Sequence, residues 1–276
     1  KNISDLKKYF NITNEGNFES KLNVISLNAQ LLDEMQTIDN WKKIRRVKKA
    51  LITARHSRVP PATDNKSIAS WNFITSTALA EVIQYCPVPA IKKRASEILV
   101  IAITAQIKQF LVAKNQNLMH LQHVNTLDVG LMYAEDYIFF AESQLKTYQV
   151  TANVDLKNNF LETMSFILKE FFHDDQIFTR ALSQNDAVLY PNLALSSFDS
   201  SFKSAVATFL IIARQGQALF PQLELSSRIS KLEENMTHQI LKNPLGAGEA
   251  LRALTYPKEI YRVIKVPKIW FEQKDF

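Results

Sequence analysis

Apolar residues recur at intervals of three and four positions along most of this 276-residue chain, which is the spacing of an amphipathic helix. The pattern predicts helices over residues 28–36, 38–56, 67–86, 88–113, 132–149, 153–173, 201–216, 221–242 and 246–255. The sequence therefore predicts an all-α protein. Short β-like segments are expected in the longer links, at residues 118–124 and 176–180, and in the tail, residues 260–276, as an edge strand or an appended arm.

The connections between these helices alternate in length. Pro87 and Pro89 separate two long helices by a tight turn, and residues 151–155 separate another pair. Longer links, residues 59–66, 115–131 and 172–200, lie between the pairs. This alternation is typical of helical hairpins in an α/α toroid, where the long loops build a pocket at one rim. An irregular bundle and an α-solenoid are the alternatives, and no fixed repeat period supports a solenoid.

Composition disfavours several other classes of protein. Hydrophobic residues make up 46% of the chain and charged residues 22%, as in ordinary globular proteins. Only 5 glycines occur, which disfavours the glycine-rich nucleotide-binding loops, and no cofactor is expected. The single cysteine, Cys86, excludes an internal disulfide and a cysteine-based zinc site. Since no apolar run approaches the roughly 20 residues that span a bilayer, no membrane partner is expected. The compartment stays open, with a soluble, cytoplasmic location favoured.

The formal net charge of +6 raises the question of a nucleic-acid partner. The positive residues are dispersed except in the segment Trp41–Arg58, where apolar residues recur at helical spacing and the basic residues fill the other face. A solvated face and a nucleic-acid surface both fit this pattern. No interleaved aromatic residues and no groove-reading module accompany it, so nucleic acid is the less expected partner.

The link and helix start over residues 55–72 form the first candidate site. A Pro-Pro pair makes the approach to the helix rigid. Asp64 is interpreted either as a cap of the helix or as a carboxylate at a pocket mouth. Trp71 and Asn72, one turn into the helix, fit a stacking platform and a hydrogen-bonding amide for a sugar-like ligand.

The second candidate is the acidic pair Glu135 and Asp136, which lies between Tyr133 and Tyr137 in an apolar helix. Adjacent helix positions point about 100° apart, so at least one acid is expected to be buried and to need a partner. The cations of the first link are the expected partners: Arg55, Arg58 and Lys66. A structural salt bridge and a catalytic pair both remain open. With Asp64, the two acids would be equipped for acid–base chemistry on a sugar.

His120 and His123 stand three residues apart in a stretch that is expected to be extended. This spacing places two metal ligands on one face only in a helix, and no acid is adjacent in the sequence, so no metal site is predicted. A pocket-lining His120 that shuttles protons is one interpretation, and an ordinary loop histidine is the other.

Several of these segments occur in an order found in a known family. They are Gly16–Ser20, Arg55–Asn72, Ala78–Glu81 and Glu135–Tyr137. From about residue 5 to about residue 254 the chain resembles the YyaL-type family of thioredoxin-domain-containing proteins, which includes spermatogenesis-associated relatives. The resemblance implies a thioredoxin-like domain followed by an (α/α)6 toroid similar to N-acylglucosamine 2-epimerases and six-hairpin glycosidases.

On this resemblance, residues 1–276 form a single α/α-toroid domain, a C-terminal fragment without the thioredoxin-like domain and the first hairpins. The chain departs from the family pattern at Asn65, Phe73, Ile138 and Lys203, which replace Asp, Gly, Ala and Asn. The candidate catalytic residues are Asp64, Glu135 and Asp136, and the candidate ligand-binding residues are Arg55, Arg58, Lys66, Trp71, Asn72, His120, Tyr137, Ser201 and Lys203.

The expected function is a carbohydrate-active or sugar-binding toroid domain, with a small sugar-like ligand as partner. Its reaction stays open between sugar epimerisation or isomerisation and glycoside cleavage, and the altered cavity allows a degenerate site. The alternative is a non-catalytic structural or interaction domain that accompanies a thioredoxin-like domain. An open pocket shared by Asp64, Trp71 and Asp136 would favour the first, and a pocket filled by Phe73 and Lys203 the second.

Overall fold

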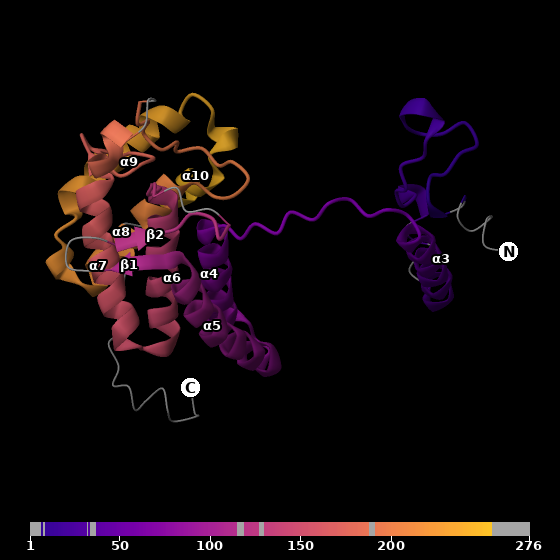
Figure 1. Cartoon of the computed structure of the whole chain (residues 1–276), viewed down its shortest axis with the longest axis horizontal. Coiled ribbons are helices and arrows are strands. Elements are labelled where there is room, and N and C mark those ends of the chain that lie inside the picture. The colour runs from indigo at the N-terminus through magenta and orange to yellow at the C-terminus, as the bar shows by residue number, and fades with distance from the viewer. Residues whose placement is uncertain are drawn as a thin grey trace. The chain divides into compact units, whose positions relative to one another are not determined.

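The computed structural model describes residues 7, 9–31, 33, 37–114, 119–126, 130–187 and 191–255. These residues are mostly helical and include two small two-stranded sheets, so the predicted all-α class is confirmed (Figure 1). The chain forms two compact units, residues 1–65 and 66–276, and each is described by itself. A single toroid domain over residues 1–276 stays a prediction.

The first unit contains the helix α3, Ile38–His56, whose limits agree with the predicted 38–56. The side chain of Thr37 accepts a hydrogen bond from the Asn40 N–H, which satisfies one of the free donors at the helix start. Of the predicted helix at 28–36, residues 29–31 form a 3₁₀ turn, and residues 32 and 34–36 lie outside the described residues. A second 3₁₀ turn spans Glu19–Lys21.

The core of the first unit is small. Ile44 and Val47 of α3 pack there with Tyr9 and Phe10. Trp41, which the sequence pattern assigns to the same apolar face, is 51% exposed instead. The buried stripe of α3 is therefore narrower than the predicted one.

The second unit contains the remaining described helices. They are α4 Ala69–Tyr85, α5 Pro89–Phe110, α6 Ala134–Thr151, α7 Val154–Glu170, α8 Ala205–Leu219, α9 Ser226–Ile240 and α10 Gly248–Thr255. Short 3₁₀ turns span Leu182–Ala187, Pro221–Leu223 and Pro244–Gly246. Each of these α-helices overlaps a predicted one, and most limits differ by a few residues. None of the described helices combines the length and the apolar character that crossing a membrane requires.

The helices of the second unit pack as successive hairpins. Helix α4 packs on α5 and α6, α6 packs on α7 and α8, and α8 packs on α9 and α10. Helices α4, α6 and α8 thus form a continuous row, and each is followed by its own return helix (Figure 1). This alternation is what an α/α toroid requires of neighbouring hairpins. Closure into a toroid stays a prediction.

The two sheets lie in the links, where short β segments were expected, and the tail predicted to be β-like, residues 260–276, lies outside the described residues. Strands β1 (Leu111–Lys114) and β2 (Met119–Leu121) pair antiparallel, as do β3 (Phe172–His173) and β4 (Gln176–Ile177). The predicted helices at 88–113 and 153–173 are therefore too long at their C-terminal ends. In the second case the reason is a tight turn, since Asp174 and Asp175 adopt φ of 47° and 60°.

The row of helices α4, α6 and α8 carries most of the core. In α8 every residue from Ala205 to Gly216 is buried, and in α6 every residue from Asp136 to Leu145. The predicted start of α8 at residue 201 is four residues early, because Ser204 caps the helix by accepting from the Ala207 N–H. The first turns of α4 and α6 consequently stand in a well-packed frame.

Candidate functional site

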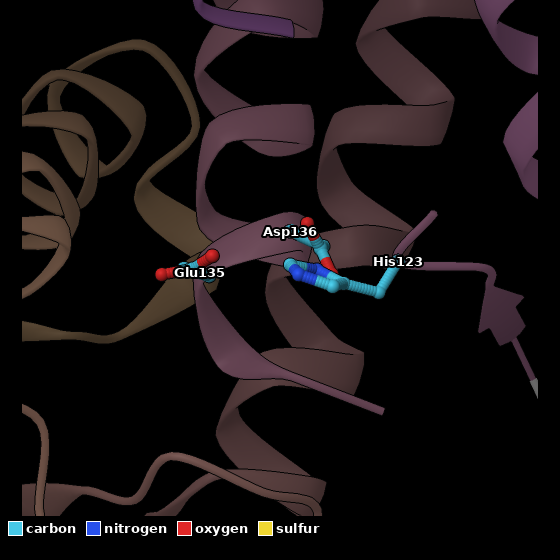
Figure 2. Close-up of side chains that lie close together, drawn as sticks. All are labelled: His123, Glu135 and Asp136. Carbon is cyan, nitrogen blue, oxygen red and sulfur yellow. The ribbon is translucent and has the colours of Figure 1, made fainter. Parts of the chain in front are cut away.

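The acid Asp136, in the first turn of α6, is fully buried. Its Oδ1 accepts a hydrogen bond of 3.0 Å from the backbone N–H of Ser70, in the first turn of α4. Its Oδ2 lies 2.8 Å from Nδ1 of His123, and Figure 2 shows the imidazole against this carboxylate. Both oxygens of the buried acid are therefore satisfied, which is the condition for burying a carboxylate.

His123 is held in place by backbone pairing between two links. Its carbonyl oxygen accepts from the Ala69 N–H at 2.9 Å, and Ile68 and Val124 form an antiparallel bridge. The Ser67 N–H donates to the side chain of Asn125 at 2.7 Å. This pairing brings the link after β2 to the start of α4, and so places the imidazole beside α6.

The imidazole of His123 is partly open to solvent. Its side chain is 31% exposed, whereas that of its partner Asp136 is 0% exposed. Its ring lies against Tyr133, with centroids 5.0 Å apart. We call this pair of side chains, His123 and Asp136, the dyad. Its carboxylate is buried and fixed, and its imidazole is exposed enough for an external molecule to reach.

Glu135 is the second acid of the cluster and is only half-buried. The hydroxyl of Ser70 donates to its Oε1 over 3.4 Å, a long hydrogen bond. In Figure 2 the Glu135 carboxylate lies to one side of His123 and Asp136. It therefore takes no part in the hydrogen bond between those two residues. The structure therefore separates the two adjacent acids, one locked in the core and one at the surface of the site.

The environment shifts the proton affinities of all three groups. Burial raises the pKa of Asp136, and the contact with His123 opposes this rise. Burial also raises the pKa of Glu135, and repulsion from Asp136 adds to it. The hydrogen bond to Asp136 raises the pKa of His123, against the opposing effect of desolvation. Both carboxyl groups thus bind a proton more readily, and the His123 imidazolium loses one less readily, than the same groups in water.

The arrangement of His123 and Asp136 suits acid–base chemistry. With Nδ1 bound to the buried carboxylate, the neutral imidazole keeps its proton on Nδ1 and leaves Nε2 to accept another. Glu135, whose pKa is raised by burial, keeps a proton to higher pH than an exposed glutamate. Two groups that can take up and release protons thus stand side by side.

The same three residues also offer possible metal ligands. The ligand atoms of His123, Glu135 and Asp136 lie within 4.8 Å of one another. An imidazole with two carboxylates is a set that divalent transition metals accept. The sequence predicted no metal site because no acid stands beside the histidines in the chain, but the fold supplies two. The bond at 2.8 Å and the Ser70 N–H already occupy Asp136, so hydrogen bonds account for its geometry.

An aromatic wall stands next to this cluster. Trp71 of α4 is 51% exposed and contacts Phe202 edge to face, with centroids 6.4 Å apart. Phe202 contacts Phe139 of α6 in the same way at 5.5 Å. The Nζ of Lys203 lies 5.7 Å from the Phe139 ring centre. Two predicted ligand-binding residues, Trp71 and Lys203, are thus joined by two phenylalanines that the sequence did not single out.

Two predicted ligand-binding residues have structural roles in this fold. Tyr137 is fully buried, its hydroxyl donates to the Met119 carbonyl at 2.6 Å, and it accepts from the Leu121 N–H at 2.9 Å. Asn72 donates through its amide to Ser67 and to a backbone carbonyl at the start of α4. The Tyr137 hydroxyl and the Asn72 amide nitrogen thus hold the helix starts, and a ligand-binding role for either residue stays a prediction.

Several predicted site residues lie in the first unit or at the unit boundary. Arg55, Arg58 and Asp64 are exposed in the first unit, and their predicted meeting with the acids of α6 stays a prediction. In the second unit Lys66 and Ser201 are exposed, and His120 is half-buried in β2. Within the second unit the partner of the buried acid is His123, which the sequence did not predict.

His123 is the main residue that sequence reasoning missed. A signal for it existed, because a buried acid in α6 requires a partner and His123 stands 13 residues before Asp136. The nearer of the two histidines in the sequence is thus the one that reaches the acid. His123 reaches the acid because residues 67–68 pair through their backbone with residues 124–125, and the sequence does not show this pairing.

A groove of about 660 Å³ opens at the other end of α6. It is lined by Leu99 and Ile103 of α5 and by residues around the α6–α7 turn, among them Val150 and Val154. No candidate site residue lines the groove. It lies at the C-terminal end of α6, whereas Glu135 stands in the first turn of that helix. The groove is therefore distinct from the candidate site.

No protein-family model matches the chain, and the search of curated proteins finds no significant match. The class is thus defined by the fold and the site alone. It is an all-α protein with a cluster of one histidine and two carboxylates where two neighbouring helices begin.

Proposed function

We propose that this protein is carbohydrate-active. It binds a sugar-type ligand against Trp71 of the aromatic wall, and it transfers protons through His123 and Glu135. The observation that supports this most is the dyad of a partly exposed His123 and a fully buried Asp136 beside a half-buried Glu135. A base, an acid and an aromatic platform on adjoining helix starts are the groups that sugar chemistry needs.

Each residue has its own role in this proposal. His123 accepts a proton at Nε2, and Asp136 positions the imidazole and stabilises its charged form without touching the ligand. Glu135 donates or returns a proton on the ligand side. Trp71 stacks on the apolar face of the sugar. Asp136, predicted as catalytic, thus becomes a positioning residue, because it is fully buried and both its oxygens are bonded.

The burial of Asp136 also bears on the type of reaction. Glycoside hydrolases usually need two carboxyl groups that both reach the substrate, roughly 5–9.5 Å apart. Within the second unit only Glu135 of the adjacent acids is open to a ligand. The site therefore favours proton abstraction and return on a sugar, as an epimerase or isomerase performs, over glycoside cleavage. The toroid fold that the family resemblance implies is similar to that of a known epimerase group.

The experiment is solvent exchange into sugars. The protein is incubated in D₂O with a panel of free aldoses and N-acylated hexosamines, and deuterium at the carbon next to the carbonyl is followed by NMR. We expect exchange with at least one sugar, and a loss of about 10²–10⁴-fold in His123→Asn and in Glu135→Gln. His173→Asn is the matched control, because His173 also pairs with an acid, Asp174, but at an exposed site.

Two results would contradict the proposed function. If no sugar of the panel exchanges and none changes the fluorescence of Trp71, the carbohydrate proposal is wrong. Equal exchange in His123→Asn and in the wild-type protein would exclude the dyad as the base.

A non-catalytic role is the second candidate, and one observation favours it. The bonds of Asp136 to Ser70 and His123 join the start of α4, the link after β2 and the start of α6. Such a junction stabilises a fold whether or not a ligand binds. In that case His123→Asn lowers the free energy of unfolding, and no sugar protects the wild-type protein against unfolding.

A further inference from the structure

The cluster of His123, Glu135 and Asp136 has the ligand types of a zinc site. One ligand atom from each residue, an imidazole nitrogen and two carboxylate oxygens, lies within 4.8 Å of the other two (Figure 2). Zinc accepts both histidine nitrogen and carboxylate oxygen, whereas the harder ions Mg²⁺ and Ca²⁺ take oxygen ligands. The mixed donor set therefore favours zinc over the harder ions.

The spacing within the dyad also fits a bound ion. Zinc binds nitrogen and oxygen ligands at about 2.0–2.2 Å, which places two ligands of one ion about 3 Å apart. Nδ1 of His123 and Oδ2 of Asp136 are 2.8 Å apart, so one ion reaches both atoms after small shifts. The third ligand, Glu135, is half-buried, and its long hydrogen bond of 3.4 Å to Ser70 constrains its carboxylate only weakly.

Asp136 is oriented in the way that ligating carboxylates usually are. Its Oδ1 accepts a hydrogen bond of 3.0 Å from the Ser70 N–H, which fixes the carboxylate and leaves Oδ2 as the oxygen for an ion. Among the described residues, His123 is the only basic side chain that pairs with either acid, so two carboxylates are available to balance a dication. The 31% exposure of the His123 side chain gives the ion access and leaves a coordination position for water.

We propose that His123, Glu135 and Asp136 bind a zinc ion in place of the proton between Nδ1 and Oδ2, and that bound zinc and proton transfer by the dyad exclude each other. The site itself is independent of the proposed function, and only the exclusion rests on it. The hydrogen bond of the dyad and the bonds to zinc use the same two atoms, so a proton and the ion compete for them.

The exclusion follows from where the protons go. Without the ion, the neutral imidazole of His123 carries its one proton on Nδ1 and donates it to Asp136. When zinc takes Nδ1, that proton leaves and the neutral ring carries its one proton on Nε2 instead. Nε2 then cannot accept a proton from a ligand. Any proton on Glu135 passes to solvent when its carboxylate binds the ion.

The first measurement is isothermal titration calorimetry with Zn²⁺ alone, after removal of metal with a chelator, and with Mg²⁺ as the matched ion. We expect one Zn²⁺ per chain, no comparable binding of Mg²⁺, and an affinity about tenfold or more lower in Glu135→Gln and in His123→Asn. His173→Asn is the matched control, because His173 and Asp174 form an exposed pair at 3.3 Å. Glu135→Gln retains both residues of the dyad, so it tests the site even if His123→Asn does not fold. Thermal unfolding shows which variants are folded.

The second measurement is ¹⁵N NMR of the histidine rings, at a pH where the His123 imidazole is neutral. We expect the Nδ1–H tautomer of His123 without zinc and the Nε2–H tautomer with zinc bound. Zinc that binds elsewhere on the surface would leave the His123 tautomer unchanged. The readout therefore reports on Nδ1 itself and does not depend on any sugar.

The outcomes separate the zinc site from the carbohydrate function. No binding of Zn²⁺, equal binding in wild type and in both site variants, or an unchanged His123 tautomer overturns the zinc site and leaves the carbohydrate function standing. Deuterium exchange into a sugar at its full rate in zinc-saturated protein overturns the exclusion. Zinc binding that depends on His123 and Glu135, with no exchange into any sugar, supports the site and contradicts the carbohydrate function.

Discussion

The Nδ1 atom of His123 lies 2.8 Å from Oδ2 of Asp136, across a junction between the link after β2 and the first turn of α6. The acid is fully buried and the imidazole is partly exposed, so the bond connects the core with the surface of the site. Predictions for stability, for pH dependence and for ligand binding follow from this relationship and from the packing around it.

The first prediction concerns the pH dependence of stability in Asp136→Asn. Because Asp136 raises the pKa of His123 in the folded protein, the bond contributes fully below the ordinary value of 6.5. The contribution is lost as the pH rises through the raised pKa of the folded state. The difference in free energy of unfolding between wild type and Asp136→Asn should therefore decrease as the pH rises from below 6.5, measured by urea unfolding. A difference that stays constant with pH would contradict the account.

The second prediction concerns Tyr137→Phe. Loss of the hydroxyl leaves the Leu121 N–H and the Met119 carbonyl unpaired in the core, so the variant should lose about 1–3 kcal/mol of unfolding free energy. Sugar affinity should not change, since Tyr137 does not face the ligand. Tyr85→Phe is the control, because Tyr85 is 70% exposed. A loss of sugar affinity without a loss of stability would restore Tyr137 as a binding residue.

The third prediction concerns Phe73, which the family resemblance marked as added bulk near the site. Phe73 is buried, with its ring centre 6.0 Å from that of Phe110 and 4.8 Å from that of Phe140. It fills the core between α4, α5 and α6. We predict that Phe73→Ala lowers the unfolding free energy by about 3–5 kcal/mol. Phe18→Ala, at a residue 57% exposed, should cost far less.

The fourth prediction concerns the two tryptophans that are exposed to the same extent. Trp71 and Trp41 are each 51% exposed, but only Trp71 belongs to the candidate site. A sugar ligand should change the fluorescence of wild-type protein and of Trp41→Phe, and the change should be lost in Trp71→Phe. A signal that follows Trp41 instead would place the ligand in the first unit.

Most of the fold was predictable from the sequence, because apolar periodicity identifies a helix without knowledge of its neighbours. The limits of α3 agree with the prediction, since a threonine cap and a regular apolar stripe define them locally. The ends of α5 and α7 were wrong by three residues each, because pairing with β2 and β4 determines where these helices stop. Such pairing depends on residues further along the chain.

The site was predictable only in part. The sequence identified Glu135 and Asp136, and the rule that a buried acid needs a partner was correct. It did not assign His123 as that partner, because an arginine or lysine is the usual one and the histidine stands in a link with no regular pattern. It also assigned a ligand-binding role to Tyr137, because a tyrosine beside two acids has the same appearance in a sequence whether it faces the core or the ligand.

The most direct test of the dyad is the titration of the His123 imidazole, followed by NMR in wild-type protein and in Asp136→Asn. The chain has 5 histidines, so the His123→Asn variant assigns the signal. We predict a pKa above 6.5 in the wild-type protein and a clear fall in Asp136→Asn, because the buried carboxylate stabilises the charged imidazole. A His123 signal that titrates identically in both proteins would contradict the dyad, and with it the assignment of His123 as the base.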